Sequence, residues 1–244
     1  MAGNSHWSKI KRAKGANDAK RGKIWSKIVR KIMIAAKTGG DPNDNLNLRY
    51  TIDEAKAANV PKDTIANAIK KGSGEIGAAN FEEVVYEAYA GGGVAMMIEG
   101  LTNNPSRTAP DIRAILERGG GNLATRGAVA FQFTKQGIIA IKSDAVDEDK
   151  LLEVALDAGA DDVKNQGEVF EVFTVPTAFI KVKEAILAAG IAVEASEITQ
   201  MPNSTVPIDG EHAVKLLKLI ETLEDNDDVQ SVSHNAEIPD SVMV

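Results

Sequence analysis

The chain has 244 residues, of which 43% are hydrophobic and 26% charged, and a formal net charge of −7. These values are ordinary for a folded protein, and the length suits two or three small domains. The absence of cysteine excludes disulfide bonds, a thiolate zinc site and a cysteine nucleophile. No apolar run approaches the roughly 18 residues of a membrane span, and the first residues lack the apolar stretch of a signal peptide, so we expect a cytoplasmic protein with no membrane partner.

Positive charge is concentrated near the N-terminus. The first 71 residues contain sixteen Lys or Arg and six acids, a net charge of +10, whereas the other 173 carry twelve Lys or Arg and 29 acids, a net charge of −17. Such asymmetry indicates an anionic partner, either nucleic acid or a membrane surface. The basic segment lacks the apolar residues that accompany the charge of a helix at a membrane surface, so nucleic acid is the expected partner.

A basic arm and three helices are predicted at the start of the chain. Residues 1–19 show no clean period and are interpreted as an extended or weakly ordered arm. Apolar residues at helical spacing then predict helices at 20–37, 46–58 and 61–72. Short amphipathic helices bury their apolar stripes only against neighbours. Residues 1–75 are therefore predicted to be a three-helix domain with a basic arm.

Strands and helices alternate in the rest of the chain. The first part predicts strands at 81–89 and 94–101, a helix from 107 or 108 to 118, and a strand at 128–133. A second part predicts a strand at 138–141, a helix at 147–158, a strand at 169–175, a helix at 177–189 and a strand at 193–198. A proline-bearing linker at 201–207 precedes a last helix at 210–223 and a strand at 228–233.

These elements predict an α+β protein with one domain inserted in another. The run from 138 to 198 resembles a ferredoxin-like, or split β-α-β, unit. The preceding part lacks a second helix and a fourth strand, which the C-terminal helix and strand can supply. The predicted domains are 1–75, a discontinuous α+β domain of 76–134 plus 205–244, and an inserted ferredoxin-like domain of 135–204.

Candidate cofactor and catalytic motifs fail on inspection. GSGEIG at 72–77 matches G-x-G-x-x-G, but it follows a helix and precedes a strand, so a linker is the better interpretation. The three histidines are not at metal-ligand spacing. EDNDD at 224–228 lacks the pattern of a calcium loop and is interpreted as a solvated helix end. We expect no cofactor, no metal, no small-molecule ligand and no enzyme.

The basic residues of the arm and first helix are the candidate nucleic-acid contacts, because Lys and Arg neutralise phosphates. Trp7 can stack on an unpaired base or pack on the arm's own helix, whereas Trp25 lies on the apolar face of its helix and is expected to pack in a core. The candidates are Trp7, Lys9, Lys11, Arg12, Lys14, Lys20, Arg21, Lys23, Lys27, Arg30 and Lys31. The helix offers no Asn or Gln to read base edges, which favours contact with the phosphate backbone.

Long stretches of the chain resemble the YebC/PmpR family. They are MAGNSHWSKIK, DAKRGKIWSKIVRKI, AKAANVPKDTIANAIKKGSGE, YEAYAGGGVA and LTNNPSRTAPDIRAIL. The resemblance implies an N-terminal helical domain and two α+β domains, one inserted in the other, with no established reaction or cofactor. It also implies a basic loop before the middle-domain helix. The family usually has a basic residue and Asn where Pro105 and Ser106 stand, which leaves Arg107 as the candidate there.

The family resemblance leaves two substrates open. It implies either a transcriptional regulator that binds double-stranded DNA, or a ribosome-associated translation factor that binds ribosomal RNA and relieves stalling, for example at proline runs. The mitochondrial translational activator of cytochrome c oxidase is a family member that acts on translation. The sequence shows no groove-reading helix and no heptad repeat, and a basic arm with glycine and tryptophan suits folded RNA. We expect a non-enzymatic nucleic-acid-binding regulator of gene expression; an enzyme acting on nucleic acid is the weaker alternative.

Overall fold

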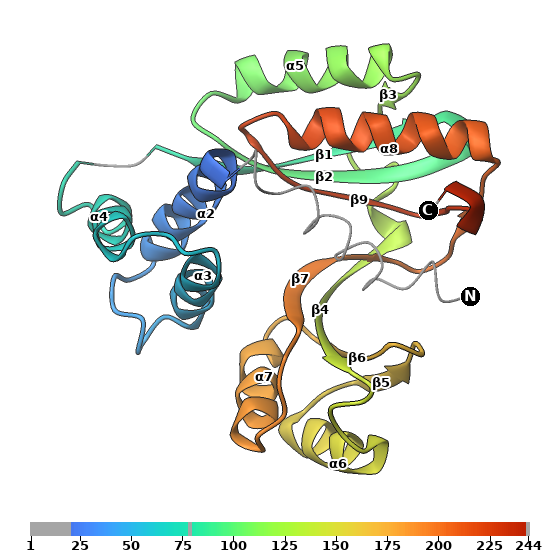
Figure 1. Ribbon diagram of the computed structural model, residues 1–244. Coiled ribbons are helices and arrows are strands. Elements are labelled where there is room, and N and C mark those ends of the chain that lie inside the picture. Colours follow the sequence, from blue (N-terminus) through green and yellow to red (C-terminus); the bar gives the residue numbers. More distant parts are fainter. Residues whose placement is uncertain (1–20, 78–79, 243–244) are drawn as a thin grey trace.

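The computed structural model describes residues 21–77 and 80–242 and contains a helical part and two four-stranded antiparallel sheets, each with two helices (Figure 1). The predicted α+β class is confirmed. The helical part comprises α2 (Arg21–Ala36), α3 (Leu46–Ala57) and α4 (Lys62–Gly72). It lies beside both sheets rather than at one end of the molecule (Figure 1).

The three helices bury a shared apolar core. Ile28 and Ile32 of α2 pack with Leu48 of α3 and Ile65 of α4. Asn45 caps α3 by accepting the backbone N–H of Leu48 at 3.0 Å, which satisfies one of the free donors at a helix start.

Trp25 packs against this core, as its position on the apolar face predicted. Its indole N–H donates to the carbonyl oxygen of Ala58 at 2.9 Å. At the end of α4, a Cβ on Gly72 would lie 2.3 Å from the carbonyl oxygen of Met33. Only glycine therefore allows α4 to approach α2 so closely.

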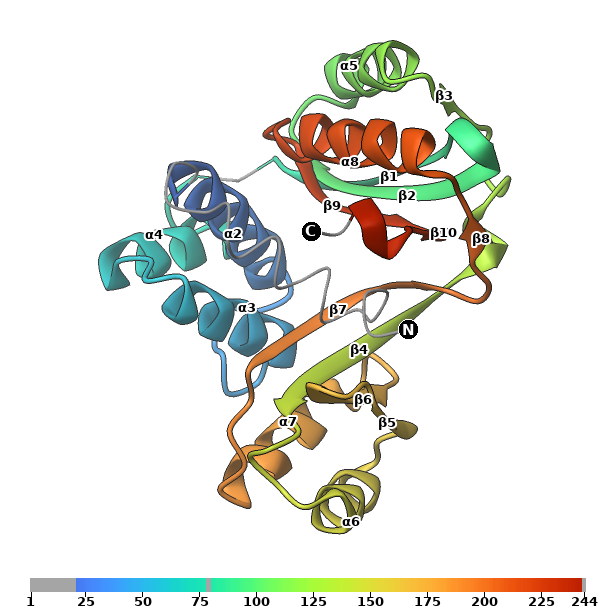
Figure 2. The ribbon, with the colours of Figure 1, turned by 45° about the vertical axis from the view of Figure 1, so that its right-hand side comes forward.

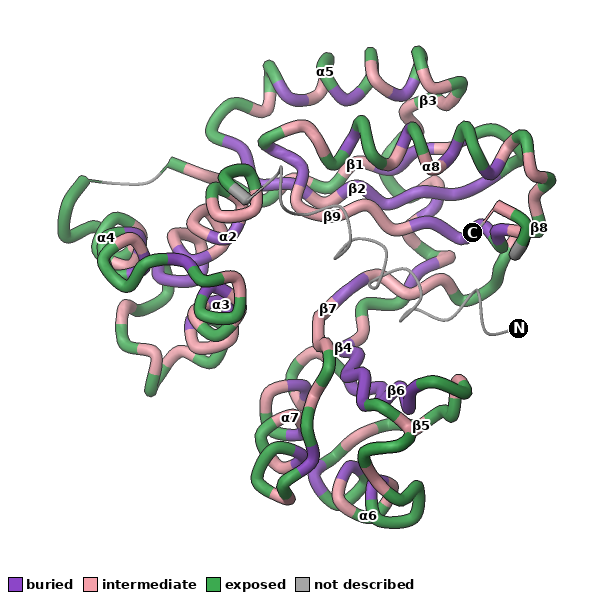
Figure 3. The backbone as a smooth tube through the Cα atoms, in the orientation of Figure 1, coloured by how far each residue is buried: buried purple, intermediate pink, exposed green. Residues whose placement is uncertain are grey.

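The first sheet has the order β3-β1-β2-β9. Its strands are β1 (Glu82–Ala90), β2 (Val94–Thr102), β3 (Asn122–Leu123) and β9 (Val229–His234). The helices α5 (Pro105–Arg118) and α8 (Gly210–Glu224) pack on one face, and β2 is buried along almost its whole length (Figure 3). The C-terminal helix and strand therefore complete this sheet, as the sequence predicted.

The prediction of a strand at 128–133 is wrong. Residues Ala130–Gln132 form a short 3-10 turn, η3, and the two-residue strand β3 occupies the edge beside β1 instead. The apolar residues of this stretch do not continue a ladder, because their backbone N–H groups bond to the carboxylate of Glu87. Phe133 starts the next strand, which runs without a break to Lys142.

The second sheet has the order β5-β6-β4-β7. Its elements are β4 (Phe133–Lys142), α6 (Glu148–Ala158), β5 (Asp162–Asn165), β6 (Val169–Thr174), α7 (Phe179–Ala188) and β7 (Ala195–Pro202). This β-α-β-β-α-β sequence is the ferredoxin-like arrangement. The sequence missed β5, a short strand with a single apolar residue, and the linker expected at 201–207 includes the end of β7 and β8 (Val206–Pro207), which pairs with β10 (Ala236–Glu237).

The long strands β4 and β7 connect the two sheets (Figure 2). They begin and end at Phe133 and Pro202, within two residues of the predicted insertion at 135–204, and the division into domains stays a prediction. At the junction, the carboxylate of Glu99 in β2 accepts hydrogen bonds from Ser231 at 3.1 Å and from Gln200 of β7 at 3.2 Å.

The helical part also contacts the second sheet's helices. Tyr50 of α3 meets Phe179 of α7 edge to face, with ring centroids 5.3 Å apart. Arg49 forms an ion pair with Glu184 at 3.1 Å. The helical part is thus held by α7 on one side and, through α2, by the loop after α8 on the other.

Candidate nucleic-acid interface

The predicted contact residues divide between the arm and the folded part. Those that lie outside the described residues are Trp7, Lys9, Lys11, Arg12, Lys14 and Lys20. Arg21 is the first residue of α2, and its side chain is not among those described. The structure places the side chains of Lys23, Lys27, Arg30, Lys31 and Arg107.

The basic face of α2 lies against the acidic segment 224–228, which follows α8. The ammonium of Lys23 is 3.2 Å from the carbonyl oxygen of Asp225 and 3.5 Å from its carboxylate. The ammonium of Lys27 is 2.6 Å from the carbonyl oxygen of Glu224. The last carbonyls of a helix lack partners within it and carry partial negative charge, so cations stabilise that end. Two lysines of α2 thus cap the C-terminus of α8.

Asp228 is the centre of this contact. The guanidinium of Arg30 donates both to the carbonyl oxygen of Asp227 and to the carboxylate of Asp228. The donors to the Asp228 carboxylate are Arg30 at 3.0 Å, Arg107 at 2.6 Å, Thr108 at 2.8 Å and Thr102 at 3.2 Å. Asp228 is only 4% exposed. The expectation of a solvated helix end is therefore wrong at this residue, because it is a buried, fully hydrogen-bonded carboxylate.

Two opposing effects set the pKa of Asp228. Burial raises it, but the hydrogen bonds from Arg107, Thr108 and Thr102 and the charge of Arg107 outweigh burial, so that the pKa lies below its ordinary value. For Lys27, burial lowers the pKa of the ammonium, against the opposing charges of Glu224 and Asp227. The pKa of Asp228 is thus governed by its hydrogen-bond donors, and the pKa of Lys27 by its burial.

Lys31 and Arg107 also bind within the protein. Lys31 pairs with Glu54 of α3 at 2.8 Å, and Arg107 reaches the same Asp228 as Arg30. The five described candidates are therefore brought to partners on the protein itself. Their role in nucleic-acid binding stays a prediction, and the structure gives each of them a structural contact.

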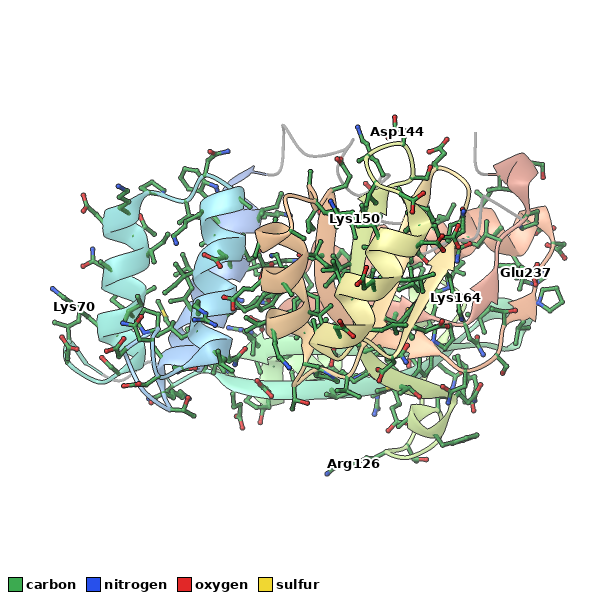
Figure 4. All side chains as sticks on the ribbon, turned by 90° about the horizontal axis from the view of Figure 1, so that it is seen from below. Lys70, Arg126, Asp144, Lys150, Lys164 and Glu237 are labelled. Carbon is green, nitrogen blue, oxygen red and sulfur yellow. The ribbon has the colours of Figure 1, made fainter. Side chains whose placement is uncertain are left out.

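Sequence reasoning overlooked three lysines of α4. Lys62, Lys70 and Lys71 are exposed, and none of them forms an ion pair with any residue in 21–77 or 80–242. Lys70 extends from the outer edge of the helical part (Figure 4). The signal was present in KDTIANAIKKG, which has three lysines and one acid, with apolar residues on the opposite face of the helix. These cations are free to meet phosphate.

Other chemistry finds little support in the part of the chain that the structure describes. No group of three or more His, Asp or Glu there is placed to hold a metal ion. His212 has its ring Nδ1 2.9 Å from both oxygens of Asp209, but Asp209 also accepts the backbone N–H of His212 and so caps α8. Among the described helices, none combines the length and the apolar character of a membrane span.

Comparison with known proteins relates both parts of the chain to one family. A family model described as the TACO1/YebC protein N-terminal domain matches residues 5–75. A second, described as the TACO1/YebC second and third domain, matches residues 81–236. Together the two models span almost the whole chain in the predicted order.

Relatives of full length support the same assignment. A protein of Desulfatibacillum aliphaticivorans is 49% identical over 244 residues, covering 100% of this chain and 99% of the relative. One from Acidithiobacillus ferrooxidans is 50% identical over 244 residues, covering 100% and 97%. Both are named "Probable transcriptional regulatory protein". The crystal structure of a conserved hypothetical protein from Aquifex aeolicus is 45% identical, with a TM-score of 0.81 over 91% of this chain and 92% of that one. The chain therefore belongs to the TACO1/YebC family.

Proposed function

We propose that the protein is a non-enzymatic, cytoplasmic regulator of transcription that binds double-stranded DNA through its N-terminal part. The observation that carries this proposal is the charge division, +10 in the first 71 residues against −17 in the remainder. The names of the relatives from Desulfatibacillum and Acidithiobacillus support a role in transcription. Cations supply most of the affinity of a protein for duplex DNA, through phosphate contacts and the release of counterions.

The available cations suggest how the surface works. On α2, Lys23, Lys27 and Arg30 are held by the acidic segment 224–228, so their charge is already balanced. The proposed phosphate contacts are therefore the arm cluster Lys9, Lys11, Arg12 and Lys14, together with Lys62, Lys70 and Lys71 of α4. The acidic remainder of the chain repels phosphate and so turns the helical part toward the DNA.

A translation factor that binds ribosomal RNA is the second candidate. The observation that favours it is Trp7, which lies in a glycine-containing basic arm and suits stacking on an unpaired base in folded RNA. Sequencing of the DNA and the RNA crosslinked to the protein in cells distinguishes the two. Reads gathered at a few promoters support the proposal, whereas reads concentrated on ribosomal RNA would replace it with the second candidate.

The binding surface is tested by a salt titration. We expect the quadruple variant Lys9→Ala, Lys11→Ala, Arg12→Ala, Lys14→Ala to bind a DNA duplex more weakly, and the slope of log affinity against log salt to become shallower by about 3.6, because each of four phosphate contacts contributes about 0.9. Fluorescence anisotropy measures both quantities, and circular dichroism checks that the fold is unchanged.

The matched control removes four exposed cations from the acidic remainder, in the variant Lys150→Ala, Lys181→Ala, Lys215→Ala, Lys218→Ala. It has the same net charge as the arm variant and is expected to keep the salt slope of the natural protein. Equal losses in both variants would mean that affinity follows net charge alone. An unchanged affinity in the arm variant would remove the arm from the binding surface.

A further inference from the structure

A surface loop at residues 124–132 exposes an aromatic ring in the acidic remainder of the chain. Phe131 is 73% exposed, more than any other large hydrophobic side chain in the described part of the chain. Its neighbours at alternate positions, Val129 and Phe133, are instead buried and pack with Ala95 and Met97 beneath the first sheet. The chain thus buries two apolar side chains here and leaves the ring between them in water.

The loop is held rigidly from below. The carboxylate of Glu87, which is only 6% exposed, accepts the backbone N–H groups of Gly127 at 2.5 Å, Val129 at 2.7 Å and Ala130 at 2.9 Å. Burial raises the pKa of this carboxyl, but the three N–H groups and the charge of Arg126 outweigh burial and lower it overall. Hydrogen bonds to a charged acceptor are the strong ones, so the loop keeps one shape.

A second set of contacts fixes the backbone around the ring. The side-chain amide of Asn203 donates to the carbonyl oxygen of Phe131 at 3.1 Å, and its backbone N–H donates to the carbonyl oxygen of Gln132 at 2.8 Å. The amide of Asn235 donates to the side-chain oxygen of Gln132 at 3.1 Å. The ring of Phe131 therefore stands on an anchored backbone, and little conformational freedom is lost when a partner covers it.

The charge of the chain segment that contains Phe131 favours an anionic partner. Residues 118–143 contain four Lys or Arg and no Asp or Glu, in a part of the chain that is otherwise strongly acidic. Lys135 and Lys142 of this stretch pair with Glu99 and Glu194. Arg126 is exposed, forms no ion pair with the described residues, and projects away from the body of the molecule (Figure 4).

We propose that loop 124–132 is a nucleic-acid contact separate from the N-terminal part, in which the ring of Phe131 stacks on an unpaired base and Arg126 binds a neighbouring phosphate. Proteins hold single strands with exposed aromatic rings and cations on one surface, since every base has a face on which to stack, and loop 124–132 exposes one of each. A protein partner would need an apolar surround, whereas the exposed side chains nearest to Phe131 in the sequence are Thr125, Arg126, Thr134 and Lys135. This inference rests on the proposed function, that the protein binds nucleic acid.

The test compares two DNA probes of equal length: a full duplex, and a duplex with a central run of unpaired bases. We expect Phe131→Ala to weaken binding to the unpaired probe by between about 5-fold and 150-fold, the contribution of one stacked base, and to leave binding to the full duplex unchanged. Because Phe131 is exposed, its replacement is expected to preserve the fold. Val214→Ala, which removes a side chain that is 58% exposed on α8, is the matched control and should alter neither affinity.

A gain of signal completes the test. Phe131→Trp keeps the stacking surface, so its affinity for the unpaired probe should match that of the natural protein, and its added fluorescence should be quenched on that probe. Arg126→Ala should reduce the salt slope on the unpaired probe by about 1.

The outcomes separate this inference from the proposed function. A natural protein that binds neither probe would overturn both. Salt-dependent binding that Phe131→Ala leaves intact on the unpaired probe, or weakens equally on both probes, would overturn the loop's role alone. A photo-reactive phenylalanine derivative at position 131 that crosslinks in cells to protein and not to nucleic acid would reassign the loop to a protein partner.

Discussion

The basic face of α2 and loop 124–132 differ in what surrounds their charges. The face of α2 has more cations, yet Lys23, Lys27 and Arg30 each bind the acidic segment 224–228. The loop has one arginine and one aromatic ring, both exposed on a backbone that buried groups hold in place. The number of cations in a segment is therefore a poor measure of how many remain available to a ligand. Availability depends on partners that lie far away in the sequence.

The largest expected effect comes from removing the carboxylate under α2. Asp228→Ala leaves Arg30 and Arg107 without their buried partner, so we expect the free energy of unfolding to fall by about 3 to 5 kcal/mol. Urea denaturation measures the loss. Asp225→Ala is the control on the same segment, since its side chain is 42% exposed, and it should cost less than about 1 kcal/mol. If both variants lost equally little free energy of unfolding, the segment 224–228 would be a solvated helix end after all.

The loop has its own buried carboxylate, and its removal should have a smaller effect. Glu87→Gln places an amide N–H₂ where backbone N–H groups donate, so at least one donor loses its acceptor and the expected loss is about 1 to 3 kcal/mol. Hydrogen exchange at Gly127, Val129 and Ala130 should rise at the same time. Glu83→Gln, on the same strand but exposed, is the control and should alter neither quantity. Unchanged exchange in the Glu87 variant would show that other contacts hold the loop.

Acid should weaken both regions in the same pH range. In the folded protein the pKa values of Asp228 and Glu87 lie below their ordinary values. The ordinary values, which apply in the unfolded chain, are about 4. The unfolded chain therefore binds protons first, so the stability that these groups contribute is complete above about pH 4 and is lost as the pH falls through the folded values. Unfolding free energies measured at decreasing pH should show this decline, and Asp228→Asn should flatten it. If the free energy of unfolding of that variant fell as steeply with pH, groups other than Asp228 would be responsible for the decline.

The smallest effects distinguish paired from free lysines. Lys62→Ala, Lys70→Ala, Lys71→Ala should lower the salt slope of DNA binding by about 2 to 3, because these lysines are free to meet phosphate. Lys23→Ala, Lys27→Ala should leave the slope unchanged and reduce the free energy of unfolding by about 1 kcal/mol. Anisotropy and urea denaturation are measured on both variants. A reduced slope in the second variant would mean that DNA displaces the acidic segment from α2.

The sequence predicted the elements well where the pattern is local. The helix expected at 20–37 is α2 at Arg21–Ala36, because apolar spacing and the following glycines act within a few turns. The short strands β3 and β5 were missed, since two or four mostly exposed residues carry no period. The error at 128–133 has a distant cause, the carboxylate of Glu87 some forty residues earlier.

The candidate site shows the same limit. Composition located the basic segment, but the partner of Arg30 lies 198 residues further along the chain, and no spacing rule connects the two. Periodicity does not reveal the exposure of Phe131 either. In a strand, residues 129, 131 and 133 would share one face, so the pattern predicts that Phe131 is buried like Val129 and Phe133. The three lysines of α4 were readable from the sequence and were overlooked in favour of the more strongly charged arm.

The distance between Arg30 and Asp228 along the chain also has a consequence for biosynthesis. Domains generally fold from the N-terminus as the polypeptide emerges from the ribosome. While the chain is being made, α2 can form long before the segment that neutralises it has been synthesised. Throughout that interval the nascent protein presents an uncovered cationic helix to the RNA-rich surface from which it emerges. The contact between α2 and Asp228 can therefore form only when synthesis of the chain is almost complete.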